Sequence, residues 1–449
     1  MNWMKGLMAA TLSFALIIPT AGGMVSAATN DDEPSVATAG VELRSTLGHL
    51  MSEHGYLAIE AMRKGAQGSA DFEASTNALA ANTEDLSNAI ASVYGDDAGA
   101  SFKEMWSAHI GYFVDYVKAT GANDEDAKQM ALDELSQYRK DFSQFLETAT
   151  EERLEAGALA DGLQMHVNQL IGAFDSYVAG DFDKAYEYER EAIGHLHMVA
   201  KGLSSAITDQ FPEKFNNTKA VTPAGDLRAT LNHLLSEHAG LAMMAMQNGI
   251  DGSEDFEASA NALSANTDDL AAAITSVYGE EAGQAFKEMW SAHISYFVDY
   301  VKATGADDEE AKQAALDELE QYRADFSAFI ENATGGEVPA SALSEGLQEH
   351  VNQLIGAFNS YVDEDYEKAY ETIRNAYGHM YGSAKALSGG IVAQSPEEFA
   401  NQMPSDMPKT GLVNTSAQQN MEWAWMLTGF LIVAAATTGF VIRRKKTEA

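Results

Sequence analysis

The fold is decided by residues 105–122, MWSAHIGYFVDYVKATGA, which return as residues 289–306 with a single change, Ser295 in place of Gly111. The offset of 184 positions holds without a gap far beyond this stretch in both directions. The chain is therefore one domain written twice, and any chemistry found in one copy should be sought at the matching position of the other.

Apolar residues of this stretch recur at helical spacing, four, four, three and four positions apart: Phe102, Trp106, Ile110, Phe113 and Val117. Such spacing places them on one face of an α-helix and predicts the stripe that faces the core. Met105 and His109 are four positions apart and one step round the helix, so we expect them at the border of the stripe.

Both copies are rich in alanine, leucine, glutamate and methionine and nearly free of proline, a composition typical of helices. We predict an all-α protein of two tandem homologous bundles, each of about six antiparallel helices. Ser69 and Asn123 are expected N-caps. The six helices resemble three hairpins, in one bundle or a short solenoid-like array. In the first copy the expected helices are 41–64, 70–93, 97–120, 124–148, 153–178 and 182–207.

The predicted organisation has eight parts. They are a signal peptide (1–28), a disordered segment (29–39), helical copy 1 (40–215), a linker (216–226), helical copy 2 (227–399), a stalk with a sorting motif (400–411), a transmembrane helix (423–442) and a basic cytoplasmic tail (443–449).

The N-terminal part reads as a secretory signal. Lys5 precedes an apolar run over 6–18, and Val25, Ser26 and Ala27 offer small residues at a cleavage site. The apolar run is too short to span a bilayer comfortably. We therefore expect an exported protein.

The C-terminal part has three features in order: the motif Met407, Pro408, Lys409, Thr410, Gly411, then the apolar run 423–442, then basic residues. The run is long enough for one membrane helix, and the basic tail should stay cytoplasmic. This order resembles the sorting signal of Gram-positive surface proteins, whose motif is Leu-Pro-any-Thr-Gly. Met407 stands where that family has leucine.

The resemblance implies that a sortase cuts between Thr410 and Gly411 and joins the chain to cell-wall peptidoglycan. The membrane would be reached only through the C-terminal helix. The alternative is a plain single-pass membrane anchor, which the apolar run alone would also explain.

The chain is strongly acidic, with 67 acidic and 28 basic residues and a net charge of −39. Such a surface repels phosphates, so we expect no nucleic-acid partner. A solvated acidic coat is favoured over a calcium site, since no EF-hand loop occurs. Cysteine is absent, which excludes disulfides, zinc–thiolate sites and thiol catalysis.

Histidine is the residue type that suggests a site. Ten of the eleven histidines form five pairs at matching positions of the two copies: His49/His233, His54/His238, His109/His293, His166/His350 and His195/His379. Two carboxylates lie one turn from a histidine, Glu53 and Glu237, and two methionines one turn before a histidine, Met105 and Met289. Imidazole and thioether ligands suit copper. The alternative is structural histidines with methionines as gap fillers.

Signatures of the common enzyme classes are missing. The chain has no Glu-x-x-His pair for a di-iron site, no His-Glu-x-x-His, no Gly-x-Ser-x-Gly and no phosphate-binding or Rossmann loop. The repeated domain resembles exported Gram-positive modules labelled copper amine oxidase-like. The chain has no Asn-Tyr dipeptide, so the resemblance implies a copper association without oxidase activity.

We therefore expect a non-enzymatic surface protein that displays two acidic helical domains as a structural or binding module of the envelope. The alternative is an extracellular copper-binding protein. Convergence of His54, His109 and His166 would favour the second hypothesis.

Overall fold

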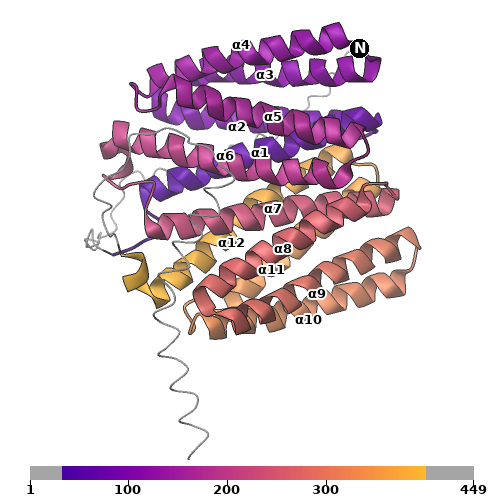
Figure 1. Cartoon of the computed structure of the whole chain (residues 1–449). Coiled ribbons are helices and arrows are strands. Elements are labelled where there is room, and N and C mark those ends of the chain that lie inside the picture. Colours follow the sequence, from indigo (N-terminus) through magenta and orange to yellow (C-terminus); the bar gives the residue numbers. More distant parts are fainter. Residues whose placement is uncertain (1–32, 401–449) are drawn as a thin grey trace, which may run out of the picture. The chain divides into compact units, whose positions relative to one another are not determined.

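The computed structural model describes residues 33–400, and within them the chain is all-α, as predicted (Figure 1). Copy 1 contains α1 (Ala39–Gln67), α2 (Phe72–Tyr94), α3 (Asp96–Ala122), α4 (Glu125–Ala149), α5 (Ala156–Val178), α6 (Phe182–Gln210) and the 3-10 turn η1 (Pro212–Phe215). Copy 2 contains α7 (Pro223–Asp251), α8 (Phe256–Tyr278), α9 (Glu280–Gly305), α10 (Glu309–Ala333), α11 (Ala340–Val362), α12 (Tyr366–Gln394) and η2 (Pro396–Phe399).

The expected signal peptide, the sorting motif 407–411 and the apolar run 423–442 lie outside the described residues. Among residues 33–400, no helix combines the length and the apolar character that a membrane span requires.

The helix ends differ from the prediction at two caps. Asp71, not Ser69, is the N-cap of α2, and Asp124, not Asn123, is that of α4. The Asp124 side chain accepts a hydrogen bond from the backbone N–H of Ala127 at 3.0 Å, which satisfies one of the free donors of the first turn. Asn123 instead ends α3 in the left-handed region, at φ 50°, a conformation that asparagine tolerates.

The connection between the copies is shorter than expected. Helix α7 begins at Pro223, four residues before Leu227, because Thr222 caps it and accepts from the N–H of Gly225 at 3.0 Å. Proline is favoured in the first helical turn, where its missing N–H costs nothing. Residues 216–222 are thus all that separates η1 from α7.

The first helix of each copy is buried on nearly every side. Along α1 the residues from Leu50 to Lys64 are all buried, and α7 is buried similarly from Leu234 to Asn248. Helices α1 and α7 contact each other, and α1 also packs on α6 as α7 does on α12. One continuous core therefore runs through both copies, with members such as Leu57, Leu241 and Tyr377.

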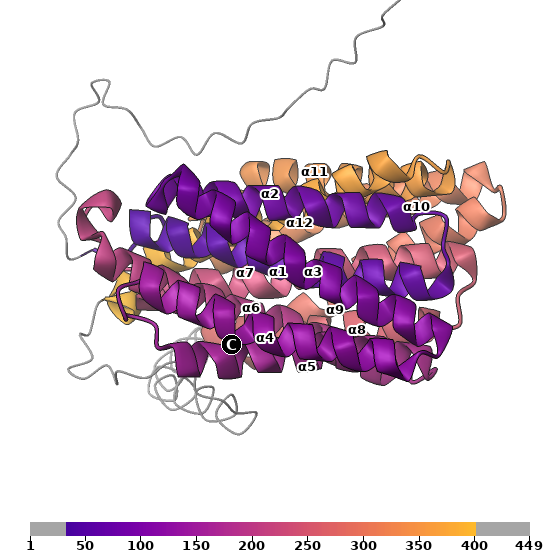
Figure 2. The same ribbon diagram turned by 90° about the horizontal axis from the view of Figure 1, so that it is seen from above.

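The two copies meet through reciprocal contacts. Figure 2 shows α2 beside α12, and α8 contacts α6 in the same way. Arg374 of copy 2 binds Glu53 at 3.0 Å, and the matching residue of copy 1, Arg190, binds Glu237 at 3.1 Å. An exchange in which residue i meets j and j meets i is the signature of a twofold interface. The tandem chain therefore pairs its copies as a symmetric dimer pairs its subunits.

At the centre of this interface lies a buried set of charges, named here the junction network: Glu60, Arg63, Lys64, Asp71 and Asp255. Arg63 binds Glu60 at 2.7 Å and Asp255 of the other copy at 3.1 Å, while Lys64 binds Asp71 at 2.8 Å. All five residues are at most 4 % exposed. The network breaks the twofold pattern, since α7 has neutral residues at the positions of Glu60, Arg63 and Lys64: Met244, Gln247 and Asn248.

We expect Arg63→Ala to destabilise the protein by about 3–5 kcal/mol, because the buried carboxylates of Glu60 and Asp255 lose the positive charge that they bind. Urea denaturation followed by circular dichroism measures the loss. Arg153→Ala is the control: Arg153 binds the exposed Glu151, and such surface pairs contribute about 1 kcal/mol or less. Equal effects of the two substitutions would contradict the role of the network.

Candidate metal centres

Three histidines from three helices converge inside each copy. One ring nitrogen from each of His54, His109 and His166 lies within 4.8 Å of the others, and the same holds for the matching residues of copy 2. We name these sets the His54 triad (His54, His109, His166) and the His238 triad (His238, His293, His350). Among the described residues, these are the groups with the spacing of a metal site.

The packing of the hairpins brings each triad together. In copy 1 its members come from α1, α3 and α5, the first helices of the three hairpins, and α1 contacts both α3 and α5. His54, His109 and His166 are 0 %, 2 % and 5 % exposed. His109 is therefore a core residue rather than the border residue that the helical spacing suggested, because α1 and α4 cover that side of α3.

Aromatic rings enclose the triads. The ring centroid of Trp106 lies 4.7 Å from those of both His54 and His109, and Tyr138 stacks on His109 at 4.9 Å. In copy 2, Tyr322 stacks on His293 at 4.7 Å. These aromatic rings pack against the imidazoles and hold them in place.

The ring nitrogens of the triads are short of hydrogen bonds. Neither ring nitrogen of His54 or of His166 has a hydrogen-bond partner among the described residues. In copy 2 the Nε2 atoms of His238 and His293 are 3.4 Å apart, at the long limit for a hydrogen bond. Buried polar atoms nearly always have hydrogen-bond partners. Buried ring nitrogens without partners are the arrangement expected of metal ligands.

Burial also fixes the protonation of the triads. It lowers the pKa of His109 and of His293 to about 3. Burial, and then the neighbouring His109, lowers the pKa of His54 well below its usual value. All are therefore neutral at pH 7, and a neutral imidazole has the free lone pair that a metal ion requires.

The structure separates the other candidate residues from the triads. The ring of His195 donates to the carbonyl oxygen of Gly162 at 3.1 Å, and His379 donates to that of Gly346 at 2.9 Å. These two histidines therefore already have a structural partner.

Two further pairs lie at the junction of the copies. The Nε2 atom of His49 lies 3.9 Å from Oε1 of Glu53, and Nε2 of His233 lies 3.8 Å from Oε1 of Glu237. Each carboxylate already binds an arginine of the other copy, Glu53 to Arg374 and Glu237 to Arg190. His197, whose counterpart in copy 2 is Tyr381, lies beside His233 with ring centroids 4.9 Å apart and planes tilted by 37°.

The methionines of the His/Met hypothesis pack beside the tryptophans next to the two triads. Met105 and Met289 are half-buried and pack against neighbouring apolar clusters centred on Trp106 and Trp290.

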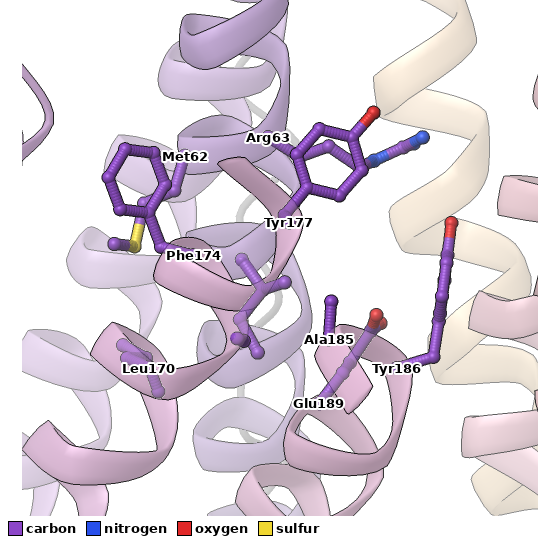
Figure 3. A pocket seen from close by; sticks show the side chains of 10 residues that line it. Met62, Arg63, Leu170, Phe174, Tyr177, Ala185, Tyr186 and Glu189 are labelled. Atoms are coloured by element: carbon purple, nitrogen blue, oxygen red, sulfur yellow. The ribbon is translucent and has the colours of Figure 1, made fainter. Parts of the chain in front are cut away.

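Sequence reasoning missed a buried acid beside the junction network. Glu189, 2 % exposed, lines a space of about 10 Å³ with Arg63, Tyr177 and Tyr186 (Figure 3). That volume suits one water molecule. Burial, and then the charge of Glu60, raises the pKa of the Glu189 carboxyl well above its usual value. Its signal in the sequence was a departure from the repeat, since copy 2 has Ile373 at this position.

Comparisons with protein families, with curated proteins and with solved structures found no match to this chain. The geometry of the triads is therefore the basis on which a function is proposed below.

We expect the metal-free protein to lose stability as the pH falls below 6.5. The unfolded chain then takes up protons on histidines that the folded state keeps neutral, so stability is complete above pH 6.5 and declines toward the folded pKa of about 3. Each such histidine costs about 2 kcal/mol at pH 5. Urea denaturation at pH 7 and 5 measures the loss.

The double variant His109→Leu, His293→Leu should show a smaller loss between these pH values than the parent protein. An unchanged pH dependence would show that these two imidazoles are not neutral in the folded state.

Proposed function

We propose that the protein binds a transition metal, one ion in each copy, through the His54 triad and the His238 triad. The supporting observation is the convergence of three buried, neutral imidazoles in both copies, with ring nitrogens that lack hydrogen-bond partners. A structural histidine would instead have a partner like that of His195.

Copper in its monovalent state is the metal proposed. Among the described residues, neither triad includes a carboxylate, so a bound ion would keep its full charge in an apolar site. The cost of burying that charge rises steeply with its size, which favours a monovalent ion. Imidazole is a good ligand for copper. Zinc is the competitor, because three histidines and a water form a common zinc site.

The proposed setting is the cell envelope. The signal-like residues 1–28 and the motif 407–411 support export and attachment to peptidoglycan by a sortase, and the acidic surface supports display in water. The two copies would then present a structural or binding module that holds metal, and we propose no enzymatic reaction for it.

Metal analysis of the whole chain tests the binding proposal. The chelator-treated protein, titrated with copper(I) without oxygen and passed through gel filtration, should retain two ions per chain. His109→Leu and His293→Leu should each retain one, and the double variant none. No retention by the parent protein, or two ions in the double variant, would contradict the proposal.

His197→Tyr is the matched control, because copy 2 already has tyrosine at this position, Tyr381. It should retain two ions. A parallel titration with zinc(II) shows which metal the site prefers. If zinc displaces copper(I), the triads bind a metal but the choice of copper is wrong.

The sorting proposal has its own test. Digestion of the cell wall should release a chain whose last residue is Thr410, and mass spectrometry identifies it. Thr410→Ala should prevent release by wall digestion. Recovery of the wild-type chain only with detergent would favour the plain membrane anchor.

A further inference from the structure

Copy 2 contains a cavity of about 400 Å³ between α7, α8 and α9. It is more than twice the size of an apolar cavity of roughly 150 Å³, which is enough for benzene. Its volume falls in the range of small-molecule sites, roughly 300–1,000 Å³.

The cavity joins the surface to the His238 triad. Its inner wall includes His238 and His293, which are 1 % and 2 % exposed. Its outer end is formed by Lys302, Gly305 and Ala306 at the C-terminal end of α9, and all three are exposed. The cavity therefore offers a path from solvent to two of the three triad members.

The chemistry of the wall selects the occupant. Apart from the two histidines and Lys302, the wall is apolar, with side chains such as Met246, Phe256 and Phe297. A charged molecule would lose its hydration there without compensation. A neutral aromatic molecule would keep its apolar surface buried. One polar atom at the inner end could bond the Nε2 atoms of His238 and His293, which lie 3.4 Å apart, at the long limit for a hydrogen bond to each other.

We propose that copy 2 binds a neutral two-ring aromatic molecule with a single hydroxyl group or ring nitrogen, its rings in this cavity and its polar atom at His238 and His293. The proposal does not depend on a metal, since the cavity and the histidines belong to the chain itself. It adds a small-molecule site to the proposed metal-binding function.

The copies differ at one lining position. Copy 1 has the same residue at every position that lines the cavity except one, where Ala66 replaces Ile250. A methyl group in place of the Gly305 hydrogen would lie 3.5 Å from Cδ1 of Ile250. The Ile250 side chain therefore lies beside Gly305 and narrows the outer end of the cavity in copy 2. The fit of a ligand near the surface should therefore differ between the copies.

Three probes of one shape test the proposal on chelator-treated full-length protein by calorimetric titration. 2-Naphthol should bind about fivefold more tightly than naphthalene, the gain that one net hydrogen bond provides. Naphthalene-2-sulfonate should bind at least about 100-fold more weakly than 2-naphthol, because its charge is desolvated. Equal binding of the sulfonate would overturn the proposal by placing the probes on the surface.

Filling the cavity tests its location. Ala242→Phe places a ring in the cavity and should lower the number of bound 2-naphthol molecules by one per chain. Ala314→Phe, on the exposed face of α10, is the control and should change nothing. Unchanged 2-naphthol binding by a folded Ala242→Phe would overturn the proposal. If that variant does not fold, Ala245→Leu replaces it with the same expected outcome.

Failure here is distinguishable from failure of metal binding. The probe titrations use metal-free protein, and the copper titrations use protein without probe. Two copper ions per chain with no naphthol binding would overturn only the cavity proposal, and the reverse result would overturn only the metal proposal.

Discussion

The structure depends on the compensation of two positive charges on a helix without a solvent-facing side. Arg63 and Lys64 lie on α1 where it is covered by α6 and α7, so their charges need carboxylate partners inside the protein. Asp255 of copy 2 is one of them, and this ties the second copy to the first in a single register. The same burial places His54, two and a half turns earlier on α1, deep in the core. Pairing of the copies and burial of the imidazole are thus two results of one constraint.

The duplicated chain separates what the two copies share from what only one has. The His54 triad and the His238 triad match in residue, burial and aromatic surroundings, including the tyrosine stacked on each central histidine. The junction network does not match, because it sits where the copies face each other and only one set of charges is needed. The triads have unpaired nitrogens and the network has paired charges. This contrast supports the proposed metal binding at the triads and favours a structural role for the network.

Helix number, order and approximate bounds followed from the apolar spacing and the breakers between helices. The apolar spacing wrongly placed His109 at the border of the buried face of its helix. A helical wheel shows one buried face, whereas α3 is covered by other helices on two faces. Asp124 replaced the predicted cap because its carboxylate accepts from the N–H of Ala127. Asp71 stands at the start of α2, but its carboxylate binds Lys64 of the junction network. Convergence of the triads could not be predicted, since it depends on how three hairpins pack. Within the junction network, Glu60, Arg63 and Lys64 were visible only as charged residues that break the repeat.

The pairing of the copies has a consequence for how the protein behaves at low concentration. Subunits that pair through a twofold interface separate when diluted, and their stability depends on concentration. Here residues 216–222 join the two halves, so each is held close to its partner at a high effective concentration. The interface between α1 and α7, and the buried charges within it, therefore persist however dilute the protein becomes.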